Sequence, residues 1–184
     1  MTEKRIPARD RVRRLPIDEL FIVPFNGMPL GIAHALALEL EGRGIKTHVD
    51  EAVPLPSAAY APARGQFRAD SLLDLLSGYR RHVLGVTHRD LFAGDLNFVF
   101  GIAAPAGACL VSTARLLAGA DDKLFLARLL KEAVHELGHT LGLPHCPDPD
   151  CVMRFSNSLA DTDRKGDAYC SGCLGRLRAR QRRR

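Results

Sequence analysis

The sequence predicts one compact α/β domain, in which helices pack on a mixed, twisted sheet. Short apolar segments rich in β-branched and aromatic residues alternate along the chain with segments whose apolar residues recur at helical spacing. The chain has 184 residues, of which 46% are hydrophobic, and this is enough to bury a single core. No internal repeat is visible.

The N-terminal part predicts a strand, a helix and a second strand. Residues 20–25 (LFIVPF) are apolar and short, and the Asn-Gly pair that follows ends them. Residues 30–41 carry apolar and small residues at helical spacing, and glycines follow as a stop signal. Residues 45–49 (IKTHV) alternate as a half-buried strand does. Residues 51–65 hold three prolines and are predicted to be a surface loop.

The middle of the chain predicts a helix followed by three strands. Residues 69–80 place their leucines on one side of a helix. Residues 82–87 and 96–101 read as strands separated by an Asp-rich turn at 89–95, and residues 106–113 form a further strand.

A third helix is the clearest element of the sequence. Asp121 or Asp122 can cap its start, and the helix should run to about Gly142. Its apolar residues recur every three or four positions: Leu126, Leu130, Ala133, Val134, Leu137 and Leu141.

This helix carries a metal-binding pattern. His135 and His139 are four residues apart, so their imidazoles project from one face and can share a zinc ion. Gly142 permits a reversal of the chain, and His145 follows as a third ligand. The alternative is that these histidines are ordinary polar residues on an amphipathic helix, because the short pattern HExxH often arises by chance. The full pattern H-E-x-x-H-x-x-G-x-x-H fixes five positions, so chance is a poor explanation.

Three histidines leave a fourth coordination position for water. Zinc lowers the pKa of that water toward neutrality, and Glu136 is placed to take its proton and later deliver it to a leaving amine. The predicted reaction is hydrolysis of a peptide bond, so a peptide is the predicted substrate.

Four of the five cysteines form two pairs after this motif: Cys146, Cys151, Cys170 and Cys173. Their spacing predicts a closed, tetrahedral structural zinc site, which gives two zinc ions per chain. Free thiols or disulfides are the alternatives, and a reducing compartment disfavours the disulfides. The fifth, Cys109, lies in an apolar run and is predicted to be a buried small hydrophobe.

The combination HELGHTLGLPHCPDPDCVM followed by CSGC resembles the archaemetzincins, also called archaelysins, which are zinc peptidases of the metzincin type. RGQFRADSLLDLL, VLGVTHRDLF, LNFVFG and LVSTARL also resemble that family, so the resemblance covers roughly residues 20–175. It implies a metzincin-like fold, the zinc ligands given above and Glu136 as the base. It also implies that Met153 is the Met-turn residue, the methionine beneath the histidine ligands, rather than core filler. Peptidase action on small peptides follows, with aminopeptidase activity as known for some members.

The sequence departs from the family pattern at three places. His88 stands where an acidic residue is expected, and the stretch between Met153 and Cys170 is one residue shorter. Phe155 occupies a position where some metzincins carry a metal-binding tyrosine, so no residue is predicted to stabilise the oxyanion.

The net charge of +5 is concentrated at the two ends, because the stretch between them is net acidic. We therefore expect a basic leader at residues 1–14, a catalytic domain at 15–175 and a basic tail at 176–184. The leader has no apolar segment behind it, which predicts a cytoplasmic protein without membrane contact. An alternative function is a non-catalytic zinc module that binds nucleic acid or a protein through the basic ends, although no aromatic residues are interleaved there.

Overall fold

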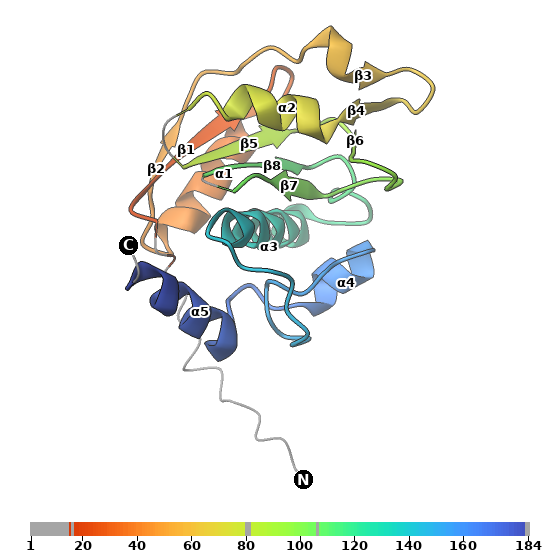
Figure 1. Cartoon of the computed structure of the whole chain (residues 1–184). Coiled ribbons are helices and arrows are strands. Elements are labelled where there is room, and N and C mark those ends of the chain that lie inside the picture. The colour runs from red at the N-terminus through yellow and green to blue at the C-terminus, as the bar shows by residue number, and fades with distance from the viewer. Residues whose placement is uncertain (1–14, 16, 80–81, 106, 183–184) are drawn as a thin grey trace.

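Five strands form the main sheet of this computed structural model, which describes residues 15, 17–79, 82–105 and 107–182. Their order across the sheet is β2-β1-β5-β8-β7 (Figure 1). The strands are β1 (Glu19–Pro24), β2 (Lys46–Val49), β5 (Val83–Thr87), β7 (Gly101–Ala103) and β8 (Ala108–Ser112). The first four in the sheet order are parallel and β7 is antiparallel to β8, which confirms the predicted mixed sheet.

Helices cover both faces of this sheet, as Figure 1 shows. Helices α1 (Leu30–Glu41) and α3 (Asp122–Thr140) pack on one face, and α2 (Ala69–Leu76) packs on the other. Strands β5 and β8 are buried along their whole length because helices lie on both sides of them. The bounds predicted for α1 are confirmed, while α2 ends at Leu76, before the predicted end near residue 80.

A second, three-stranded sheet was not predicted. It consists of β3 (Tyr60–Ala61), β4 (Gln66–Arg68) and β6 (Leu91–Phe92), and a short 3-10 turn, η2 (Ser57–Ala59), precedes it. The segment 51–65, predicted to be a surface loop, therefore contains η2 and β3, and the turn predicted over 89–95 contains β6. Strands of two or three residues are too short to show an alternating pattern. The strand predicted at 96–101 begins regular pairing only at Gly101.

Two further helices that were not predicted, α4 (Leu159–Arg164) and α5 (Ser171–Gln181), lie below α3 in Figure 1. Polar contacts join α4 to α3: the Arg128 guanidinium pairs with both oxygens of Asp163 at 2.7 and 2.8 Å. Lys131 donates to the carbonyl oxygens of Thr162 and Asp163. The basic tail expected from residue 176 begins inside α5, where Leu177 is buried.

Within the described residues, no helix combines the length and apolar character needed to cross a membrane.

Candidate metal centres and the adjoining pocket

Helix α3 positions the first two histidines and the glutamate of the predicted site. Asp121 caps the helix, since its side chain accepts a hydrogen bond from Leu124 N at 2.8 Å. Beyond Arg128 the helix is buried on almost every side, and it ends at Thr140, two residues before the predicted end. Gly142 then adopts a φ of +82°, which turns the chain back as predicted.

The turn brings the three histidines together. One ring nitrogen each of His135, His139 and His145 lies within 4.8 Å of the others. The Nε2 atoms of His135 and His139 are 3.0 Å apart. Three imidazoles that converge in this way could hold a zinc ion and leave its fourth coordination position open.

The hydrogen bonds of the outer ring nitrogens assign the tautomers. His135 Nδ1 donates to Val152 O, and His139 Nδ1 donates to Leu143 O, both at 2.8 Å. The Nε2 atoms of both rings therefore present lone pairs to each other, an arrangement that a shared cation stabilises. Burial lowers the pKa of all three histidines, so they are neutral and able to bind metal at physiological pH. The residues fit a zinc ion.

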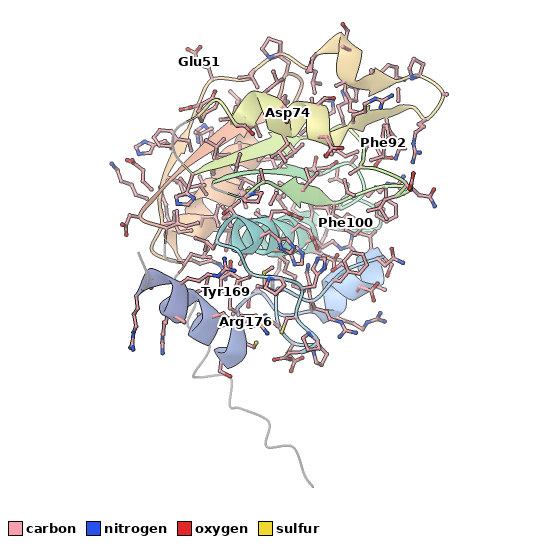
Figure 2. All side chains as sticks on the ribbon, viewed as in Figure 1. Glu51, Asp74, Phe92, Phe100, Tyr169 and Arg176 are labelled. Atoms are coloured by element: carbon pink, nitrogen blue, oxygen red, sulfur yellow. The ribbon has the colours of Figure 1, made fainter. Side chains whose placement is uncertain are left out.

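The histidines and Glu136 line one pocket of about 510 Å³. Its other wall comes from β7 and from the segment before it, including Phe98 and Phe100. Phe100 is labelled near α3 in Figure 2. Burial, and then the charge of Glu132, raises the pKa of Glu136 to about 8.

Glu136 fits against β7 because residue 101 is glycine. A Cβ at Gly101 would lie 2.6 Å from Glu136 Cγ and 2.8 Å from Glu136 Oε1. It would also lie 2.7 Å from the carbonyl oxygen of Leu110, in the neighbouring strand, so it could not be accommodated by moving a side chain alone. Gly101 therefore sets the position of the Glu136 carboxyl.

We expect Gly101→Ala to lower kcat by about 100-fold without loss of metal, because a displacement of about 1 Å at a reacting group has that effect. The measurement is kcat together with zinc content. Gly31→Ala is the matched control, since nothing lies within 4 Å of a Cβ at that helical glycine. Normal turnover in Gly101→Ala would contradict this account of the carboxyl.

The four paired cysteines also converge. The Sγ atoms of Cys146 and Cys170 are 3.7 Å apart, and those of Cys151 and Cys173 are 3.8 Å apart. Four sulfurs around zinc at bonds of about 2.3 Å are expected to lie about 3.8 Å from one another, whereas a disulfide requires about 2.05 Å. The backbone N–H of Cys170 donates to Cys151 Sγ at 3.3 Å, a contact that stabilises a thiolate. Burial raises the pKa of Cys151 to about 12, and a cation is what allows such a thiol to ionise.

Met153 lies beneath the histidine helix, where the resemblance placed it. It is fully buried, and a Cβ added to Gly138, between the two helical histidines, would collide with Met153 Sδ. Cys146 N donates to Met153 O at 2.9 Å. The hydroxyl of Tyr169 donates to Val134 O at 2.8 Å, and Figure 2 labels this residue near α3. The cysteine cluster and the histidine helix are thus one packed unit.

The remaining residues singled out in the sequence occupy different places. Phe155 lines the pocket with its ring centroid 4.9 Å from that of His145. His88 lies against Gly27 and does not line the pocket. Cys109 is fully buried in the core, as predicted.

Three residues near the site were not predicted from the sequence: Gly101, Glu132 and Lys165. Glu132 lies one helical turn before Glu136, so its helical spacing was a usable signal. Lys165 and Gly101 come from separate elements, and nothing in their local sequence connects them with the site.

Comparisons with known proteins agree with the site geometry. The model of Peptidase family M54 matches residues 57–179. The chain is 50% identical over 133 residues to an archaemetzincin of Methanopyrus kandleri, which covers 70% of this chain and 75% of that relative. It is 42% identical over 180 residues to an archaemetzincin of Pyrococcus furiosus, covering 89% and 94% of the two chains. The crystal structure of the Methanopyrus kandleri archaemetzincin superposes with a TM-score of 0.80 at 41% identity, over 90% of this chain and 96% of that one.

Proposed function

The chain belongs to peptidase family M54, the archaemetzincins, and on that premise we propose that it hydrolyses peptide bonds with Glu136 as the general base. The family is one of zinc metallopeptidases, so the chain is a zinc-dependent hydrolase. The observation that carries the proposal is the convergence of the Glu136 carboxyl and three neutral imidazoles on one pocket.

His135, His139 and His145 would hold the catalytic zinc. When bound, zinc supplies a Lewis acid that polarises a carbonyl and lowers the pKa of water. Val152 O and Leu143 O orient the two helical imidazoles through their Nδ1–H groups. Glu136 takes a proton from the attacking water and delivers it to the amine that leaves. Gly101 allows its carboxyl to lie at the wall of the pocket.

Cys146, Cys151, Cys170 and Cys173 would hold a second, structural zinc, which gives two per chain. The sulfur–sulfur distances of 3.7 and 3.8 Å support this assignment. Because Cys146 adjoins His145 in the chain, this metal would fix the third histidine as well as the loop that carries it.

Small peptides are the proposed substrates, and release of N-terminal residues is the proposed mode of action. A peptide library in which each sequence is present with a free and with an acetylated N-terminus distinguishes the two modes. An aminopeptidase cleaves the free forms and leaves the acetylated ones intact.

Metal removal tests the proposed chemistry. Treatment with a zinc chelator is expected to abolish cleavage of the library, and added zinc should restore it as long as the structural metal is retained. Zinc content, measured as ions per chain beside each assay, is expected to fall from two to one when activity is lost. Turnover that is insensitive to chelation would exclude catalysis at this centre.

Contact of the basic ends with nucleic acid or protein stays a prediction. Helix α5 exposes Arg176, Arg178 and Arg180, with Arg182 directly after it, while residues 1–14 lie outside the described part of the chain.

A further inference from the structure

A second carboxylate lines the pocket beside Glu136. Glu132 lies four residues before Glu136 on α3. Its side chain therefore emerges from the same helical face, about 6 Å closer to the N-terminus of the helix. Only 3% of the residue is exposed. Glu132 is neither one of the proposed metal ligands nor the proposed base.

Glu132 forms a buried ion pair. Its Oε1 accepts a hydrogen bond from Thr162 Oγ1 at 2.9 Å and lies 3.0 Å from Lys165 Nζ. The Lys165 side chain has no exposed surface, and its approach to Oε1 does not meet hydrogen-bond geometry. Both contacts are made to Oε1. Within the described part of the chain no hydrogen bond reaches Oε2, so this oxygen is available as an acceptor on a residue that lines the pocket.

A second polar atom in the pocket also lacks a partner. Ser156 Oγ is buried, and among residues 15, 17–79, 82–105 and 107–182 it makes no hydrogen bond. Ser156 lines the pocket next to Asn157. The facing wall, by contrast, is apolar and consists of Leu96, Phe98, Phe100 and Ile102.

We propose that Glu132 determines specificity, by accepting a hydrogen bond from a substrate side chain that has an apolar body and a neutral donor at its end. The tyrosine side chain has this chemistry: its ring matches the phenylalanine wall, and its hydroxyl can donate to Glu132 and accept from Ser156. A cation is a poorer match, because Lys165 already balances the charge of Glu132. This inference rests on the proposed function and names a substrate class for the same pocket.

Paired peptides that differ only in tyrosine against phenylalanine test the proposal, since the two differ by one hydroxyl group. Wild-type protein is expected to show a kcat/KM at least ~10-fold higher for the tyrosine peptide, as sites that bind a hydroxyl reject analogues lacking it. Removal of the acceptor in Glu132→Met/Lys165→Met should reduce the ratio to about 1. The matched variant Glu132→Gln/Lys165→Met keeps an acceptor oxygen without either charge and should retain the preference.

Equal ratios in the two double variants would overturn the proposal, as would a wild-type ratio near 1. Both double variants replace the whole ion pair, so neither leaves a buried charge unpaired. Thermal unfolding confirms that they fold. If the double variants do not fold, Ser156→Ala provides a second test. This variant removes the hydroxyl proposed to donate to the tyrosine, so it should lower the tyrosine preference several-fold.

A binding measurement separates this inference from the proposed function. In a Glu136→Gln background, the dissociation constant of each peptide is measured by calorimetry, without any turnover. Tighter binding of tyrosine that is lost in the Glu132→Met/Lys165→Met background supports the inference even if no peptide is cleaved. Cleavage of both peptides with equal affinity supports the proposed function and overturns the inference.

Discussion

Glu136→Gln is expected to lower kcat by about 10²- to 10⁴-fold while both metals and the fold are retained. Glutamine has the shape of glutamate, so it fits the narrow space between α3 and Gly101, where Glu136 Oε1 would lie only 2.8 Å from an added Cβ. It has no carboxylate to accept a proton. The loss should therefore appear in kcat, because the amide leaves the pocket walls and the three histidines in place.

The measurement is steady-state kinetics on a cleaved library peptide, with zinc content determined on the same samples. Glu39→Gln is the matched control, since this glutamate lies on the exposed side of α1. Equal turnover in Glu136→Gln and wild type, at equal zinc content, would rule out Glu136 as the base.

Cys151→Ser should remove the structural metal and, with it, most of the stability and all of the activity. Cys151 is fully buried and contributes one of the four converging sulfurs. In small zinc domains, metal binding at such a site provides about 10–16 kcal/mol of apparent folding free energy, and serine is a poor ligand in its place. The turn between Cys146 and Met153 would lose its anchor, and His145 would no longer be held against the histidine helix.

Zinc content and thermal unfolding check this result, with Cys109→Ala as the comparison. Cys109 is also fully buried but lies in β8, away from the cluster, so its replacement creates a small cavity and should leave two zinc ions in place. A Cys151→Ser protein that retains two zinc ions and its melting temperature would contradict the assignment of the four sulfurs.

Long elements with a clear period could be predicted from the sequence, and short ones could not. The predicted range of α1 matches the observed helix at both ends, and the cap at Asp121 marks the start of α3. Strands β3 and β6, of two residues each, are too short to carry a periodic signal, and β6 also depends on pairing with β4, which is distant in the sequence. Helix α4 is held by the Arg128–Asp163 pair and by other polar contacts that an apolar pattern does not reveal.

The convergence of the three histidines could be predicted because they are close in the sequence, within one helix and the turn after it. The supporting residues could not. Gly101 acquires its role when β7 folds against α3, and Lys165 acquires its role when α4 brings it to Glu132. Residue type alone would place Lys165 at the surface, since an isolated lysine is normally exposed.

The four-cysteine cluster also determines when the centre can be assembled. Both helical histidines precede the four cysteines of the cluster, and the last of these, Cys173, lies beyond α4. A ribosome that has translated HELGH has made the proposed base and two of the proposed ligands, but the proposed anchor of the third ligand is complete only after Cys173 has left the exit tunnel. On this assignment, the order of the residues along the chain delays a functional hydrolytic centre until the segment that carries α5 is available to fold.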